Sequence, residues 1–119
     1  MNNLLNETVS VLNQHGKTLS DVVWVGCIDF QIPIDQFVEC ANQEYDDGYG
    51  ASEVATDLLV VGSDFWLERH EYDGAEWWEY KELPKMPRET RNIHRVMGGT
   101  WDSLEELNMK GADDDSDNV

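Results

Sequence analysis

The feature that most constrains the fold is a tryptophan-rich stretch at residues 64–83, which is interrupted by the pair Asp73-Gly74. The aromatic side chains on both sides of this pair favour extended strands. An Asp-Gly pair between two such runs is a strong signal for a tight turn. The stretch therefore predicts a β-hairpin, and the length of its loop decides which side chains share a face.

A two-residue loop would place Glu71 opposite Glu76 and Glu68 opposite Glu79. Like charges directly opposite each other are destabilising, so we predict a three-residue loop with its glycine in the left-handed conformation. This register brings opposite charges together and places three aromatic side chains on one face. The predicted pairs are His70 with Glu76, Arg69 with Trp77, Glu68 with Trp78, and Trp66 with Tyr80, and the aromatic face consists of Trp66, Trp78 and Tyr80.

Outside the hairpin, the spacing of apolar residues predicts four further elements. They are an amphipathic helix over 2–14, a buried strand over 21–32, a short helix over 33–45 and a strand over 58–61. In addition, Asp102 followed three residues later by Glu105 resembles a capping box and predicts a short helix through Leu107. The expected fold class is α+β, with a small antiparallel sheet of about four strands, the tryptophan-rich hairpin at its centre, and two or three short helices packed against it.

The domain organisation follows from length and composition. Residues 1–110 are expected to form a single α+β domain, which is an ordinary size for one hydrophobic core. The last residues, 111–119, are low in complexity and carry like charges, so we predict an acidic disordered tail.

The charge balance limits the range of partners. Twenty-five acidic residues against eight basic ones give a formal net charge of −17, and such a field repels nucleic acid phosphates. We therefore expect no direct nucleic acid binding and favour a protein partner with a basic surface. Excess acid that only maintains solubility is the alternative. Five of the eight basic residues lie in the segment 81–95, whose role stays open.

Cysteines and targeting signals indicate a cytoplasmic location. Cys27 and Cys40 are too few and too far apart for a disulfide framework, so free thiols are expected. The first residues contain neither a basic segment nor an apolar run long enough for a signal peptide or a membrane span.

Catalytic and metal-binding patterns do not emerge from the sequence. The segment after His70 lacks the second histidine of an H-E-x-x-H motif. Convergence of Glu68, His70 and Glu76 into a metal or acid–base cluster is the alternative, and charge pairing on a sheet is the favoured interpretation. We predict no catalytic residues, no metal, no cofactor and no enzymatic activity.

The block WLERHEYDGAEWWEY, followed by KELPKMP, resembles segments of small proteins from phages and mobile elements. Small acidic phage proteins of this size are, as a group, similar to anti-CRISPR and other anti-defence inhibitors, several of which mimic DNA. The resemblance implies an inhibitor of a host defence nuclease, such as a CRISPR effector, that occupies its basic nucleic-acid-binding surface. The candidate contact residues are Glu39, Glu44, Asp46, Asp47, Glu53 and Asp57.

A small protein–protein interaction module without catalysis is the alternative function. In this case the face of Trp66, Trp78 and Tyr80 binds a protein partner or a homodimer mate, since tryptophan and tyrosine are common in binding hot spots. High salt should weaken the acidic contact and leave the aromatic contact almost unchanged.

Overall fold

The computed structural model describes residues 2–48 and 50–109, and its chain divides into two units, Met1–Pro84 and Lys85–Val119. The single α+β domain over 1–110 stays a prediction beside this division into two units. The break coincides with Pro84 and Pro87, which lack the amide hydrogen that a continuing strand needs. The predicted tail, 111–119, lies outside the described residues.

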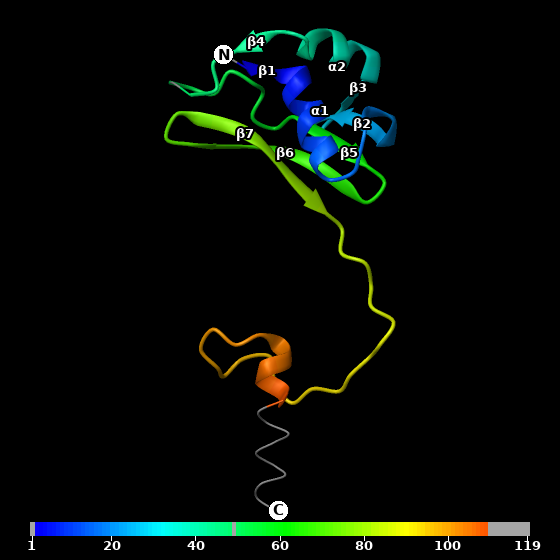
Figure 1. Cartoon of the computed structure of the whole chain (residues 1–119), viewed down its shortest axis with the longest axis vertical. Coiled ribbons are helices and arrows are strands. Elements are labelled where there is room, and N and C mark those ends of the chain that lie inside the picture. The colour runs from blue at the N-terminus through cyan, green and yellow to red at the C-terminus, as the bar shows by residue number, and fades with distance from the viewer. Residues whose placement is uncertain (1, 49, 110–119) are drawn as a thin grey trace, which may run out of the picture. The chain divides into compact units, whose positions relative to one another are not determined.

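The first unit contains all of the strands in the described residues (Figure 1). In chain order its elements are β1 (Asn2–Asn3), α1 (Leu4–Gln14), the 3-10 helix η1 (Leu19–Asp21), β2 (Val22–Gly26), β3 (Gln31–Ile32), α2 (Ile34–Ala41), β4 (Glu44–Tyr45), β5 (Leu59–Gly62), β6 (Phe65–Tyr72) and β7 (Ala75–Glu82).

The strands form a main antiparallel sheet in the order β3-β2-β5-β6-β7 and a two-stranded sheet of β1 and β4. The α+β class is confirmed. Helices α1 and α2 pack on one face of the main sheet, and Leu12 and Phe37 from the helices meet Val25, Val60 and Leu67 from the strands in a buried core. The β6–β7 hairpin lies at one edge, because β5 rather than the hairpin occupies the centre of the sheet.

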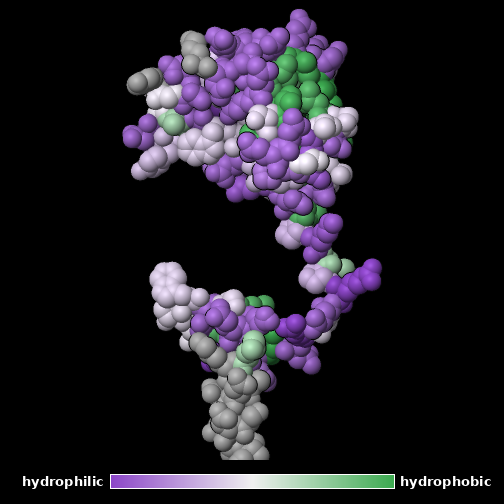
Figure 2. Space-filling view, viewed as in Figure 1, coloured by the Kyte–Doolittle hydropathy of each residue, from purple (hydrophilic) through white to green (hydrophobic). Residues whose placement is uncertain are grey.

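The predicted strand over 21–32 is wrong in its extent, because the chain folds back within it. β2 ends at Gly26, and β3 returns beside it with Val25 opposite Ile32. The amide of Cys27 donates a hydrogen bond to the carbonyl of Phe30 at 2.9 Å and closes the turn. This extra turn gives the main sheet its fifth strand and leaves a hydrophobic surface over β2 and β3 (Figure 2).

The predicted three-residue loop of the hairpin is also wrong. Tyr72 pairs with Ala75, so the loop consists of Asp73 and Gly74 alone. Both have positive φ angles, 52° and 87°, as a type I′ turn requires. The residues on β7 are therefore displaced by one position relative to the predicted register, and each of its side chains lies on the face opposite to the one expected.

In the described part of the second unit, residues 104–109 form a short helix, whose capping box lies one position later than the predicted pair of Asp102 and Glu105. It starts with a capping box in which the amide of Ser103 donates to Glu106 at 3.0 Å and the amide of Glu106 donates to the Ser103 hydroxyl at 3.2 Å. Leu107 is buried, and its carbonyl accepts a hydrogen bond from Arg95. This hydrogen bond holds Arg95, one of the basic residues of the segment 81–95, against the short helix.

Candidate binding surfaces and the buried charge cluster

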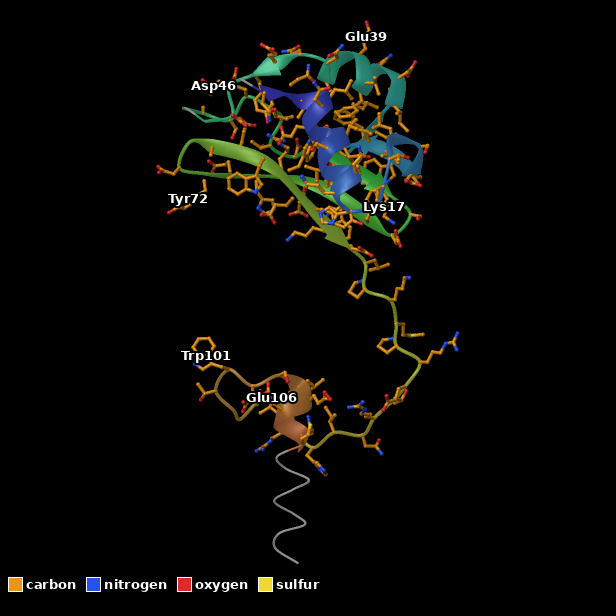
Figure 3. All side chains as sticks on the ribbon, in the orientation of Figure 1. Lys17, Glu39, Asp46, Tyr72, Trp101 and Glu106 are labelled. Atoms are coloured by element: carbon orange, nitrogen blue, oxygen red, sulfur yellow. The ribbon has the colours of Figure 1, made fainter. Side chains whose placement is uncertain are left out.

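The predicted acidic contact residues divide into two groups in the structure. Glu39 on α2, Glu44 on β4 and Asp57 before β5 are exposed, and within the described residues they make no hydrogen bond or ion pair (Figure 3 labels Glu39 and Asp46). The other three carboxylates hold the loop after β4. Glu53 accepts from the amide of Asp46 at 2.7 Å, Asp46 accepts from the amide of Gly48 at 3.0 Å, and Asp47 accepts from the Asn2 side chain at 3.3 Å.

Cations are nearly absent around these carboxylates. The unit Met1–Pro84 carries seventeen acidic and three basic residues. From Thr18 to Glu68 there are eleven acidic residues and no lysine, arginine or histidine. Lys17 lies 3.9 Å from Asp64, and Lys81 lies 3.4 Å from Glu79. The surface of this unit is therefore anionic, with its two lysines already beside carboxylates.

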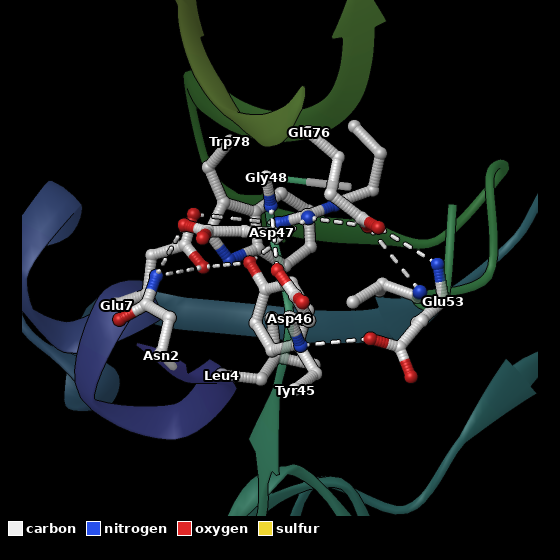
Figure 4. Close-up of polar contacts among 12 residues, drawn as sticks. Asn2, Leu4, Glu7, Tyr45, Asp46, Asp47, Gly48, Glu53, Glu76 and Trp78 are labelled. Carbon is white, nitrogen blue, oxygen red and sulfur yellow. Dashed lines mark hydrogen bonds and ion pairs between the residues drawn. The ribbon is translucent and has the colours of Figure 1, made fainter. Parts of the chain in front are cut away.

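The third basic residue of the unit, Arg69, is buried with only 3% of its side chain exposed. Its guanidinium lies 2.9 Å from Glu76 and 3.5 Å from Glu7, and it donates to the Tyr45 hydroxyl at 3.2 Å. It also lies over the Trp78 ring, 4.8 Å from the centroid. The cluster joins α1, β4, β6 and β7 (Figure 4).

Hydrogen bonds with the backbone, as well as the ion pair with Arg69, hold Glu76 in position. Its carboxylate accepts hydrogen bonds from the amides of Glu53 at 2.7 Å and Val54 at 3.2 Å. The amide of Glu76 donates to the carbonyl of Asp47 at 3.0 Å. The long loop between β4 and β5 is thus attached to the hairpin through hydrogen bonds of Glu76.

Tyr45 belongs to the same cluster, because its hydroxyl donates a hydrogen bond to Glu7. Burial, followed by this bond to a carboxylate, raises the pKa of Tyr45 to about 12. The phenol therefore stays neutral and acts as a donor throughout the physiological range. The cluster has the character of a structural network, since every charged member faces an opposite charge.

The predicted aromatic face of Trp66, Trp78 and Tyr80 does not form. Trp78 is 5% exposed and its indole donates to Thr8 of α1 at 2.9 Å. Tyr80 lies on the same helix-covered face and stacks on His15 with ring centroids 3.8 Å apart. Trp66 is on the other face, because the two-residue turn sets it opposite Lys81. The hairpin therefore anchors the core with one of its tryptophans.

The outer face of the sheet carries three half-buried tryptophans. Trp24 pairs with Val61, and Val61 pairs with Trp66, so these three side chains form a row across β2, β5 and β6. Trp77 follows on β7, opposite His70. This face was not predicted, because the assumed register placed Trp77 on the opposite side of the hairpin from Trp66.

Polar side chains of β6 and β7, namely Glu68, His70, Glu79 and Lys81, separate the tryptophans of these two strands. His70 contacts Glu68 at 2.7 Å and Glu79 at 4.0 Å, so it lies between the two carboxylates that face each other across the strands. The indoles of Trp66 and Trp77 donate to Glu68 and Glu79. These contacts, together with Lys81, explain how the Glu68–Glu79 pair is tolerated.

The predicted cluster of Glu68, His70 and Glu76 is divided by the sheet, because Glu76 lies on the opposite face. Among the described residues, no group of three or more histidine, cysteine or acidic side chains is placed to hold a metal ion. The Trp66 indole, followed by His70, holds the pKa of the Glu68 carboxyl below its usual range. In the structure, these residues have the geometry of cross-strand charge pairing.

We expect Glu68→Gln to reduce stability at neutral pH by less than about 1 kcal/mol, as is usual for exposed charge pairs. Because the folded pKa of Glu68 is lowered, its contribution is present above the ordinary glutamate pKa and is lost as the pH falls through the lowered value. Urea unfolding should therefore separate the variant from the wild type at pH 7 but not at about pH 2. Glu44→Gln, at an exposed position, is the control, and an equal difference at both pH values would contradict the prediction.

One apolar cavity of about 300 Å³ lies between α2 and the loop before β5. Phe37, Cys40, Tyr45 and Leu58 are among its lining residues. The carboxylate in its wall, Glu53, is already bound by the amide of Asp46. The described residues around this cavity include no pair of nucleophile and base joined by a hydrogen bond.

Comparison with known proteins adds no relative: no family model, no curated protein and no solved structure matches this chain. Among the described residues, none of the helices has the length and apolar character to cross a membrane.

Proposed function

We propose that the protein is a non-catalytic binding protein that occupies the basic, nucleic-acid-binding surface of a protein partner in the cytoplasm, as an anti-CRISPR-like inhibitor of a host defence nuclease would. The observation that carries the proposal is the run from Thr18 to Glu68, which has eleven acidic residues and no basic one. An excess of negative charge of this kind attracts cationic partners and repels nucleic acid.

Three carboxylates are the best placed for this contact. Glu39, Glu44 and Asp57 are exposed and make no hydrogen bond or ion pair among the described residues. Their charge therefore acts on a partner without first breaking an internal contact. Asp46, Asp47 and Glu53 contribute indirectly, because they fix the loop after β4 that leads to Asp57.

The test uses displacement of labelled DNA from purified CRISPR effector nucleases at low ionic strength. We expect the wild type to displace the DNA from at least one effector and its apparent affinity to fall as salt is added, since both surfaces are charged. The triple variant Glu39→Gln, Glu44→Gln, Asp57→Asn should weaken displacement by about tenfold or more, an effect of ~1.4 kcal/mol.

A matched control removes the same charge elsewhere. Asp113, Asp114 and Asp115 are replaced by asparagine, which changes the net charge by the same three units. This variant should bind almost as the wild type does. If both variants lose the same amount of affinity, net charge alone accounts for binding and the three exposed carboxylates have no special role. If the wild type displaces DNA from none of the effectors tested, the proposed function is refuted.

A further inference from the structure

The segment from β2 to Phe30 carries three of the exposed large hydrophobic side chains described in the first unit. Val23, Ile28 and Phe30 are 62%, 86% and 64% exposed. Within the described residues of Met1–Pro84, the other exposed large hydrophobic side chains are Tyr72 and Leu83. Three of five such residues therefore fall within eight positions of the chain, and clustered exposure of this kind marks an interaction site more often than scattered exposure does.

These side chains belong to one surface. Val23, Ile28 and Phe30 line the same shallow hollow, together with Trp24, and the hydrophobic patch over β2 and β3 is visible in Figure 2. We call Val23, Ile28 and Phe30 the apolar tip. Packing in the core does not account for the apolar tip, because Val25 and Ile32 already occupy the core side of the two strands.

The tip is held by short-range backbone contacts. The amide of Cys27 binds the carbonyl of Phe30 at 2.9 Å, and Gly26 pairs with Gln31. A turn closed in this way presents its side chains in one arrangement before a partner arrives. Such preorganisation lowers the entropy lost on binding.

The charges around the tip specify the kind of partner. Asp29 lies between Ile28 and Phe30, and Asp21 and Asp35 flank the two strands; all three aspartates are exposed. No basic residue occurs in this part of the chain. A second copy of the same chain is disfavoured as the occupant, because two units that each carry a net charge of −14 would meet with like charges.

We propose that the apolar tip is the anchor by which the acidic surface docks on a protein whose apolar pocket is rimmed by lysine or arginine. This inference rests on the proposed function and adds the hydrophobic part of the contact. Apolar side chains at the centre with charged residues at the rim are the usual anatomy of a specific interface.

The experiment uses two labelled peptides of equal length and equal lysine content, one alternating lysine with leucine and the other alternating lysine with serine. Fluorescence anisotropy measures their affinity for the full chain. We expect the leucine peptide to bind about tenfold more tightly or better, since burying a few apolar side chains contributes that much. The double variant Ile28→Ser, Phe30→Ser should abolish this preference and leave the affinity for the serine peptide unchanged.

The matched control is Tyr72→Ser, Leu83→Ser, which removes the other exposed large hydrophobic side chains described in the unit and should keep the preference. Thermal unfolding checks that both double variants are folded. If neither peptide binds, the proposed function fails. If both peptides bind equally, or the tip variant keeps the preference, the inference about the tip fails while the acidic contact stands. Sedimentation tests self-association. If the wild type is a dimer and the tip variant is a monomer, the tip is a self-association surface and the inference is overturned.

Discussion

We expect the Arg69→Met variant to lose about 3–5 kcal/mol of unfolding free energy, which is the usual cost of breaking a buried ion pair from one side. Methionine preserves much of the apolar volume of the arginine stem, so the loss comes mainly from the charge. Without the guanidinium, Glu76 and Glu7 face each other in the interior with side chains only 4% and 12% exposed. Urea unfolding followed by tryptophan fluorescence measures the change, because Trp78 contacts the cluster directly.

Two comparisons make this prediction specific. Lys81→Met removes a surface charge that lies 3.4 Å from Glu79 and should cost less than about 1 kcal/mol. Adding Glu7→Gln and Glu76→Gln to Arg69→Met should recover part of the lost stability, because the carboxylates are then neutral. A loss below about 1 kcal/mol in the single variant would mean that the cluster does not stabilise the fold. No recovery in the triple variant would mean that the loss does not come from the two unpaired carboxylates.

This cluster also explains why the register of the hairpin could not be predicted. Asp73-Gly74 marks the turn in the sequence, and the chain does reverse there. The choice of loop length assumed that Glu71 and Glu76 are both in water and repel each other. Glu76 is instead turned inward onto Arg69 and onto amides more than twenty residues away in sequence. A local sequence pattern does not indicate partners so distant in the chain. The argument from local charge pairing therefore predicted the wrong loop length.

The strand over 21–32 was predicted as one piece for a related reason. Apolar residues continue through Ile28 and Phe30, and an apolar residue was assumed to be buried. Both side chains are exposed, so their hydrophobicity marks a feature of the surface and does not indicate a buried strand. Gly26 and Asp29 within the run were the available turn signal. The exposed positions of Glu39, Glu44 and Asp57, in contrast, follow from their charge alone.

The second large effect is expected at Gly26, where the chain approaches itself closely. A Cβ atom at this position would lie 2.3 Å from the carbonyl oxygen of Phe30 and 2.6 Å from the Cα of Gln31. Both are backbone atoms of the returning strand, so no flexible side chain can move aside. We expect Gly26→Ala to cost about 3 kcal/mol, the upper part of the range for overpacking. Gly48→Ala is the matched control, because its nearest atom, in the Asp46 side chain, lies at 3.8 Å.

The thiol of Cys27 reports whether the damage is local to this turn. Cys27 is buried and Cys40 is exposed, so the measurement is made in a Cys40→Ser background with a thiol reagent under native conditions. Gly26→Ala should increase the reaction rate of Cys27 about a hundredfold if the lost ~3 kcal/mol appears as easier opening of the turn. An unchanged rate together with a lower melting temperature would place the strain elsewhere in the sheet. A faster rate would show that Gly26 holds the turn that presents Ile28 and Phe30, and such a variant should then also lose the peptide preference assigned to the apolar tip.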